Sequence, residues 1–322
     1  MKHLVLITLL LTFLTGCKTN PPVSVEVVKG KIEITANIQG AKIFVNGSDS
    51  GNLTPATLEL TPGKYTFKLT KDGYSDVEKE YTIVGNQAIS AVFELTEVSV
   101  SKIVLLEDFA NVSCDPCVIS NKILHSLSEK YKNRIAIVKF PVNFPSPNDP
   151  FYLHAKDYAG KRSSYYKIFS APTVIADGTT RPIATDSTSI INAIESNLAK
   201  IPYFNISVTK TVANSQLSVN VALDKFSDAL ENLENVIIHT VIIEKRIEFQ
   251  SPPGSNGEKI FYDVMRKMLP DADGTPLNLV NNKQTISTSV ATDPLWNKDQ
   301  LQVIVYVQNK ITKEIYQAAI SD

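Results

Sequence analysis

Two cysteines separated by two residues, Cys114 and Cys117, are the part of this sequence best suited to chemistry. A strand-like run over residues 102–109 precedes them, and a helix-like run over residues 118–131 follows. Cysteines at such a junction lie at a helix N-terminus, where unpaired N–H groups and the helix dipole favour a thiolate over a thiol. The spacing therefore predicts reversible disulfide chemistry, but it does not identify a substrate.

Two other interpretations of the cysteine pair stay open. The first is a structural or vestigial disulfide, which by closing so short a loop contributes about 2 kcal/mol in the chain-entropy model. The second is metal binding, but zinc requires four ligands. Apart from the two thiols, the mature chain offers only His125, His154 and His239 as further soft ligands. We carry thiol–disulfide exchange forward as the first hypothesis.

The N-terminus has the pattern of an export signal. Lys2 and His3 form a short basic start, and residues 4–14 form an apolar run that is too short for a permanent membrane helix. Leu14-Thr15-Gly16-Cys17 resembles the bacterial lipobox, which implies that Cys17 is acylated and becomes the mature N-terminus. We expect a signal peptide over residues 1–16 and a tether over residues 17–24, with the chain held on the membrane through Cys17.

The residues after the lipobox favour the outer membrane. Lys18 follows the cysteine where an Asp would indicate retention elsewhere, and no acidic cluster follows it. We expect an outer membrane lipoprotein that faces the periplasm. With Cys17 acylated, the two remaining cysteines can pair only with each other or with another molecule, and an exported compartment permits that pairing. The formal net charge of −1 over 322 residues gives no reason to expect a nucleic-acid partner.

A β-rich segment follows the tether. Runs of β-branched or alternating apolar residues predict strands over residues 31–38, 41–45, 56–60, 65–70 and 81–83. Turn signals separate them: Asn46-Gly47, Thr61-Pro62-Gly63 and Lys71-Asp72-Gly73. With Thr54-Pro55 and Lys64-Tyr65, these motifs resemble the PEGA family of small β-domains, over residues 25–98. The resemblance implies an envelope module without catalysis.

The next hundred residues alternate strand and helix patterns. We expect strands over residues 103–109, 135–140 and 173–176, and helices over residues 116–131, 152–161 and 187–199. This order predicts an α/β layer with some parallel pairing. Residues 203–322 return to strand patterns, over 203–211, 216–223, 236–246, 284–291, 300–309 and 314–319, which predict a β-sandwich. The segment between residues 247 and 283 has no clear period.

The α/β segment resembles the thioredoxin superfamily at five places. In chain order these are Asp108-Phe109, Cys114-x-x-Cys117, Lys139, Ala171-Pro172-Thr173 and Asp177-Gly178. The sequence departs from that pattern at Ser113, where thioredoxins usually carry Trp. For Asp108 a solvated charge, and for Lys139 a snorkelling side chain, remain the alternatives.

The resemblance implies a role for each catalytic residue. Cys114 is the exposed attacking nucleophile, and Cys117, one turn further along and more buried, resolves the mixed disulfide. Pro172, in a cis peptide bond, presents its backbone to an extended substrate segment. Asp108 relays a proton to Cys117. No cofactor is implied, and the partners would be thiols or disulfides of exported proteins.

Residues 101–322 as a whole resemble the outer membrane protein twenty-eight-related lipoproteins. The matching pieces are residues 104–109 with the cysteine pair, 148–152, Tyr165-Tyr166, 171–174 with Asp177-Gly178, and 264–270 with Gly274. The resulting fold prediction is a multidomain α+β chain. It has an all-β PEGA domain, a thioredoxin-like α/β domain over residues 99–202 and a C-terminal β-sandwich over residues 203–322.

Two functional hypotheses follow from this organisation. The first is an envelope enzyme that carries out thiol–disulfide exchange on exported proteins through Cys114 and Cys117. The second is a non-enzymatic binding or scaffolding lipoprotein, whose two β-modules contact other envelope proteins and whose disulfide is structural.

Overall fold

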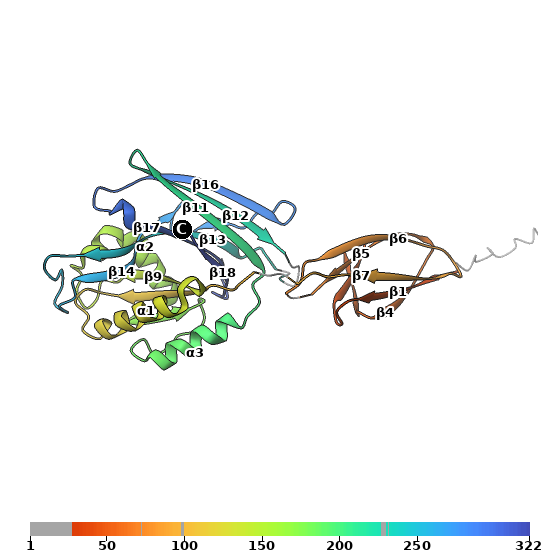
Figure 1. Cartoon of the computed structure of the whole chain (residues 1–322), viewed down its shortest axis with the longest axis horizontal. Coiled ribbons are helices and arrows are strands. Elements are labelled where there is room, and N and C mark those ends of the chain that lie inside the picture. Colours follow the sequence, from red (N-terminus) through yellow and green to blue (C-terminus); the bar gives the residue numbers. More distant parts are fainter. Residues whose placement is uncertain (1–27, 72, 98–99, 227–229, 231) are drawn as a thin grey trace, which may run out of the picture.

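A computed structural model describes residues 28–322, except for residues 72, 98–99, 227–229 and 231. The predicted signal peptide, the tether and Cys17 lie outside the described residues. Figure 1 shows an N-terminal β-domain at one end of an elongated molecule and a larger body at the other. The larger body carries the two remaining cysteines.

Two small sheets form the N-terminal domain. Its strands are β1 (Gly30–Ala36), β2 (Lys42–Val45), β3 (Ser48–Leu53), β4 (Ala56–Leu60), β5 (Gly63–Thr70), β6 (Val77–Ile83) and β7 (Ala88–Phe93). They pair in the orders β3-β2-β5-β6 and β4-β1-β7. The predicted turn at Asn46-Gly47 joins β2 to β3, and both residues have positive φ (50° and 81°), as tight hairpin turns require. Between the sheets lies an apolar core that includes Ile32, Phe67 and Phe93.

The larger body is built on one long sheet. Its strands are β8 (Val104–Ala110), β9 (Ile135–Pro141), β10 (Thr173–Ala176), β13 (Val236–Glu248), β14 (Ile260–Leu269), β15 (Thr275–Pro276), β17 (Leu301–Asn309) and β18 (Ile315–Ile320). In the described part of the chain, the order is β10-β8-β9-β14-β13-β17-β18, with β15 paired to β13. Strands β8 and β9 are parallel, and β14 meets β9 in parallel through the pair Val264–Lys139.

Helices cover both faces of this sheet. Helix α2 (Pro150–Tyr166) contributes Ala155 and Ala159 to a core with alternate residues of β8, β9, β13 and β17. Helices α1 (Cys117–Tyr131) and α3 (Ser187–Leu198) pack on the intervening residues of β8, β9 and β10. Since successive side chains of a strand point to opposite faces, α2 lies on one face, and α1 and α3 lie on the other.

A second sheet completes the body. Strands β11 (Phe204–Ala213), β12 (Gln216–Lys225) and β16 (Lys283–Ala291) pair in the order β11-β12-β16. Their apolar side chains share a core with Ile238, Ile242, Val303 and Val305, which lie on β13 and β17. This part of the molecule is therefore layered like a β-sandwich, as Figure 1 shows.

The predicted fold class is wrong, because it divides the larger body into two separate domains. A thioredoxin-like α/β domain with a separate C-terminal β-sandwich would place β8–β10 and the later strands in different sheets, but all of them belong to one sheet. Strand β14 is the cause, because it pairs with β9 on one side and with β13 on the other. The described chain is also mostly β, with three α-helices against eighteen strands.

Buried charges fix the contacts between these layers. Arg162 of α2 donates from Nε to Glu107 of β8 at 2.5 Å and from a terminal nitrogen to Gln308 of β17 at 2.8 Å. Lys102 pairs with Asp177 at 2.8 Å, and the same carboxylate accepts from the Leu105 N–H. Each of these four charged groups has an opposite charge and further hydrogen bonds, the arrangement in which burial is tolerated.

Candidate functional site

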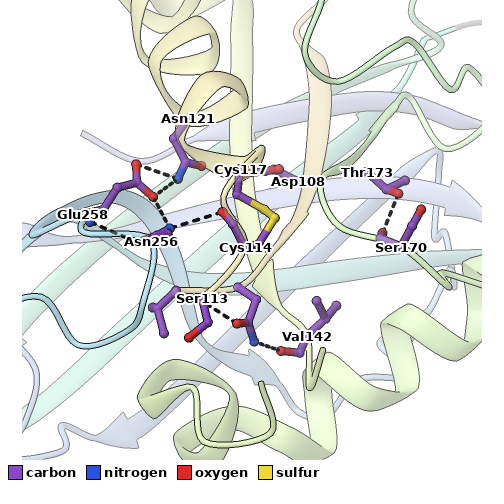
Figure 2. Close-up of a disulfide and its surroundings, with 12 residues drawn as sticks. Asp108, Ser113, Cys114, Cys117, Asn121, Val142, Ser170, Thr173, Asn256 and Glu258 are labelled. Atoms are coloured by element: carbon purple, nitrogen blue, oxygen red, sulfur yellow. Dashed lines mark hydrogen bonds between the residues drawn. A yellow bond between two sulfur atoms is a disulfide. The ribbon is translucent and has the colours of Figure 1, made fainter. Parts of the chain in front are cut away.

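A disulfide joins the two cysteines where the sequence placed the strand-to-helix junction. The Cys114–Cys117 bond is 2.08 Å long and the two Cα atoms are 5.3 Å apart. Cys117 is the first residue of α1, and its N–H donates to the Cys114 carbonyl at 3.1 Å. Figure 2 shows the disulfide with Ser113 on one side and Asn121 of α1 on the other.

Both cysteines are buried. Cys114 is 2% exposed and Cys117 is 0% exposed, and they form a small cluster with Ala110 and Ala171. The expectation that Cys114 is exposed is therefore wrong for this conformation. The apolar neighbours of the pair are Ala110 of β8 and Ala171, and a segment from the C-terminal part of the chain, described below, hydrogen-bonds to the residues that lead into the disulfide.

The loop that carries Cys114 is held by polar side chains. Asn111 donates from its amide to the carbonyls of Val142 (2.6 Å) and Ser146 (2.9 Å). The Val112 N–H donates to Asp149 at 2.9 Å, and Asp149 also caps α2. Burial raises the pKa of Asp149, while these backbone N–H groups act in the opposite direction. The start of α2 and the cysteine loop are thereby fixed to each other.

The Pro172 loop lies against the disulfide. The Ala171–Pro172 peptide bond is cis, the isomer that the resemblance implied, and Ala171 packs on the cysteine pair. The Thr173 hydroxyl donates to the Ser170 carbonyl at 2.8 Å, and Thr173 begins β10 opposite Phe109 of β8. The structure thus places Ala171, the residue before Pro172, against Cys114 and Cys117. The role of Pro172 toward a substrate stays a prediction.

Asp108 and Lys139 form a buried ion pair behind the disulfide. They lie directly opposite each other on β8 and β9, and Lys139 Nζ contacts Asp108 Oδ2. Asp108 is 0% exposed, and its Oδ1 atom has no hydrogen-bond partner among the described residues. Lys139 also donates to the Asn121 side chain at 2.5 Å. Asp108 is therefore not a solvated charge, and Figure 2 shows it among the residues around the disulfide.

A second acidic side chain, Asp263 of β14, belongs to the same cluster. It directly precedes Val264, which pairs with Lys139 in the sheet, and its φ of 57° is one that Asp tolerates. Burial raises the pKa of Asp263 to about 7, partly offset by Lys139 and Lys245 and reinforced by Asp108. Sequence reasoning missed this residue because it lies in the segment without a clear period.

The residues between β13 and β14 cover the cysteine loop. We call residues 250–258 the covering loop. Its Asn256 N–H donates to the Val112 carbonyl at 3.3 Å, and its Ser255 N–H donates to the Ser113 hydroxyl at 3.2 Å. The Asn256 amide also donates to the Cys114 carbonyl at 3.4 Å. Sequence reasoning missed these contacts too, since they join residues about 140 positions apart.

The covering loop is also tied to α1. The Asn121 amide donates to both carboxylate oxygens of Glu258, at 3.0 and 2.8 Å. His125, one turn further along α1, stacks on Tyr262 of β14 with ring centroids 3.8 Å apart. A chain of contacts therefore runs from the half-exposed Glu258 through Asn121 and Lys139 to Asp108.

Two kinds of site are not found in the described residues. No group of three or more His, Cys, Asp or Glu side chains in that part of the chain is arranged to hold a metal ion. None of the helices there has the length and apolar character needed to cross a membrane.

Comparison with known families identifies the N-terminal domain. Residues 29–99 match the PEGA domain family, so the PEGA domain predicted from the turn motifs is confirmed. No curated protein matches the chain.

Solved structures resemble part of this chain. HBP35 of Porphyromonas gingivalis is 14% identical with a TM-score of 0.56, and the match covers 70% of this chain and 76% of that chain. A protein from Agrobacterium tumefaciens is 10% identical with a TM-score of 0.46, over 69% and 95% of the two chains. A domain of the outer membrane lipoprotein Omp28 from Porphyromonas gingivalis is 15% identical with a TM-score of 0.27, over 38% and 88%. At such identities the likeness to HBP35 concerns the fold. Within this chain, the family assignment that the comparisons support is the PEGA domain over residues 29–99.

Proposed function

We propose that this chain is a lipid-anchored cell-envelope protein whose Cys114–Cys117 disulfide exchanges with thiols of exported proteins. The anchor rests on the lipobox at Cys17, and the orientation toward the periplasm rests on the residues that follow it. The exchange rests on the disulfide itself and on what surrounds it. The clients would be exported proteins with free thiols or disulfides, and no nucleic acid is involved.

The proposed reaction balances without a cofactor. A client thiolate attacks Sγ of Cys114, a client–Cys114 disulfide forms, and the sulfur of Cys117 leaves with the electron pair and takes up a proton. A second client thiolate then attacks the client sulfur of this mixed disulfide and releases Cys114. The client loses two electrons and two protons in forming its disulfide, and the cysteine pair gains them. The same steps in reverse reduce a client disulfide.

One observation carries this proposal: the disulfide packs against Ala171, which precedes Pro172, and lies near the buried Asp108, whose Oδ1 has no hydrogen-bond partner in the described part of the chain. A disulfide that only closes a four-residue loop needs neither neighbour. A buried unpaired carboxylate oxygen is costly, and such atoms are concentrated at functional sites. We propose that Asp108 passes to Cys117 the proton that Cys117 gains on reduction.

A second candidate function follows from the burial of both sulfurs. In this alternative the disulfide is structural, and the PEGA domain and the β11-β12-β16 sheet supply binding surfaces for other envelope proteins. The observation that favours it is the 2% exposure of Cys114 under the covering loop. A buried sulfur cannot meet a client thiolate unless the loop moves.

Trapping experiments separate the two candidates. With Cys117→Ser, the proposed exchange leaves clients bound to Cys114 through a disulfide that is visible on non-reducing gels, and the matched Cys114→Ser variant traps none. Wild-type protein should also accelerate insulin reduction by a thiol above the rate of free dithiol. No trapped species together with no acceleration would exclude exchange. Partners that are pulled down equally by the Cys114→Ser/Cys117→Ser variant would support the binding function.

A further inference from the structure

We infer that the covering loop, residues 250–258, is a gate over the disulfide that must swing away before Cys114 can react. This inference rests on the proposed function, since it names how exchange at the same site is controlled. The loop contacts Val112, Ser113 and Cys114, the three residues that lead into the disulfide. Cys114 is 2% exposed, packed with Ala110 and Ala171 and hydrogen-bonded through its carbonyl to the loop.

The contact between loop and cysteine segment depends on a glycine. A Cβ atom added at Gly254 would lie 2.2 Å from the Val112 carbonyl oxygen and 2.5 Å from its carbonyl carbon. Backbone therefore meets backbone at this point, an approach that any larger residue prevents. Alanine at position 254 must push the loop away from Val112, because both colliding atoms belong to the main chain.

The loop has the features of a segment that can move as a unit. The β13–β14 hairpin ends at the bond from the Phe249 N–H to the Lys259 carbonyl, 2.8 Å long, so the loop has two adjacent ends. Beyond that bond, and besides the close approach of Gly254 to Val112, the loop is joined to the cysteine segment by hydrogen bonds of 3.2–3.4 Å, at the long end of the usual range. Segments with few buried apolar contacts and exposed hydrogen bonds open at low cost.

Hydrogen bonds to Glu258, away from the disulfide itself, hold the gate closed. Glu258 accepts two hydrogen bonds from Asn121 of α1 and a third from Asn256 of the loop itself, at 2.9 Å. Charge-assisted hydrogen bonds to a carboxylate are about twice as strong as neutral ones. Neutralising Glu258 while keeping its shape should therefore loosen the gate without touching either cysteine.

Reduction kinetics of the oxidised full chain test the gate. The measurement is the rate at which excess dithiothreitol reduces the disulfide, followed by quenching and thiol counting. We expect Gly254→Ala to raise this rate about 10-fold or more, and Glu258→Gln to raise it several-fold. The matched control is Gly160→Ala, since a Cβ at position 160 of α2 meets no atom within 4 Å. It should leave the rate unchanged.

The outcomes distinguish the gate from the proposed function. Unchanged rates in Gly254→Ala and Glu258→Gln, with circular dichroism matching wild type, would overturn the gate. If Gly254→Ala fails to fold, Glu258→Gln alone decides. Faster reduction in these variants supports the gate whether or not clients are oxidised, because dithiothreitol is not a client. Client trapping at wild-type speed with unchanged reduction rates would keep the proposed function and remove the gate.

Discussion

Asp263 should make the stability of this protein fall as the pH rises from about 4 to about 7. Burial, reinforced by Asp108 and opposed by Lys139 and Lys245, raises the pKa of this carboxyl from 3.8 to about 7. The folded chain therefore keeps a proton that the unfolded chain loses above about pH 4. The stabilising contribution is fully present below pH 3.8 and is lost as the pH passes through about 7.

The magnitude follows from the size of the shift. Roughly three pKa units at about 1.4 kcal/mol each give a penalty of about 4 kcal/mol on the free energy of unfolding above pH 7. Asp263→Asn removes the titration while keeping the size of the side chain, and Asn tolerates the positive φ of 57° at this position. The variant should match wild type near pH 4 and exceed it by up to about 4 kcal/mol at pH 8.

Urea unfolding at pH 4, 5.5, 7 and 8 measures this difference. The only tryptophan, Trp296, is buried and donates to His154 at 3.0 Å, so its fluorescence reports unfolding of the larger body. Asp157→Asn, at an exposed position of α2, controls for the loss of a carboxylate as such. A difference between Asp263→Asn and wild type that is the same at pH 4 and pH 8 would refute the reasoning.

Two further predictions concern stability. Arg162→Met leaves Glu107 buried and unpaired, so urea unfolding should show a loss of about 3–5 kcal/mol, and adding Glu107→Gln should restore part of it; equal losses in the single and double variants would contradict this. The Cys114→Ser/Cys117→Ser variant should lose about 2 kcal/mol, because closing a four-residue loop removes little entropy from the unfolded chain; a loss above about 4 kcal/mol would mean that the disulfide is a main structural support.

Most individual elements were predictable because their patterns are local. The helix expected over residues 187–199 and the strand over residues 173–176 agree with α3 and β10 to within one residue. Caps and apolar spacing encode such elements directly: Asp186, for example, accepts from the Thr188 N–H at the start of α3.

Strand β14 was not predictable from the sequence. The prediction of the fold class was wrong as a result, because β14 is the strand that joins the two predicted domains in one sheet. Residues 260–269 do not alternate between apolar and polar side chains: the strand lies inside the sheet between β9 and β13, its Met265 and Met268 pack in the core with α2, and it carries Asp263 and Arg266. Arg266 is satisfied by Glu244 at 2.9 Å, a partner 22 residues away. When both faces of a strand are covered, its period disappears, and only the neighbouring strands reveal it.

From the sequence, only the candidate site residues of the cysteine-bearing segment were predicted. Spacing and resemblance identified Cys114, Cys117, Asp108 and Pro172, because all four belong to one contiguous motif-bearing segment. Asp263 and the covering loop come from a part of the chain about 140 residues later, and contact over such a distance leaves no local signal. The prediction that Cys114 is exposed was also wrong, because spacing does not show how closely Ala110 and Ala171 pack on the pair.

The position of β14 has a consequence for how this protein can be divided. A fragment that stops near residue 202 would carry both thiols. It would lack β14, so one edge of β9 would be unpaired, and it would lack the covering loop. An unpaired edge strand invites association with other chains. Folding of the part that carries the disulfide should therefore require the residues up to the last strand, so the smallest unit expected to fold extends from about residue 101 to residue 322.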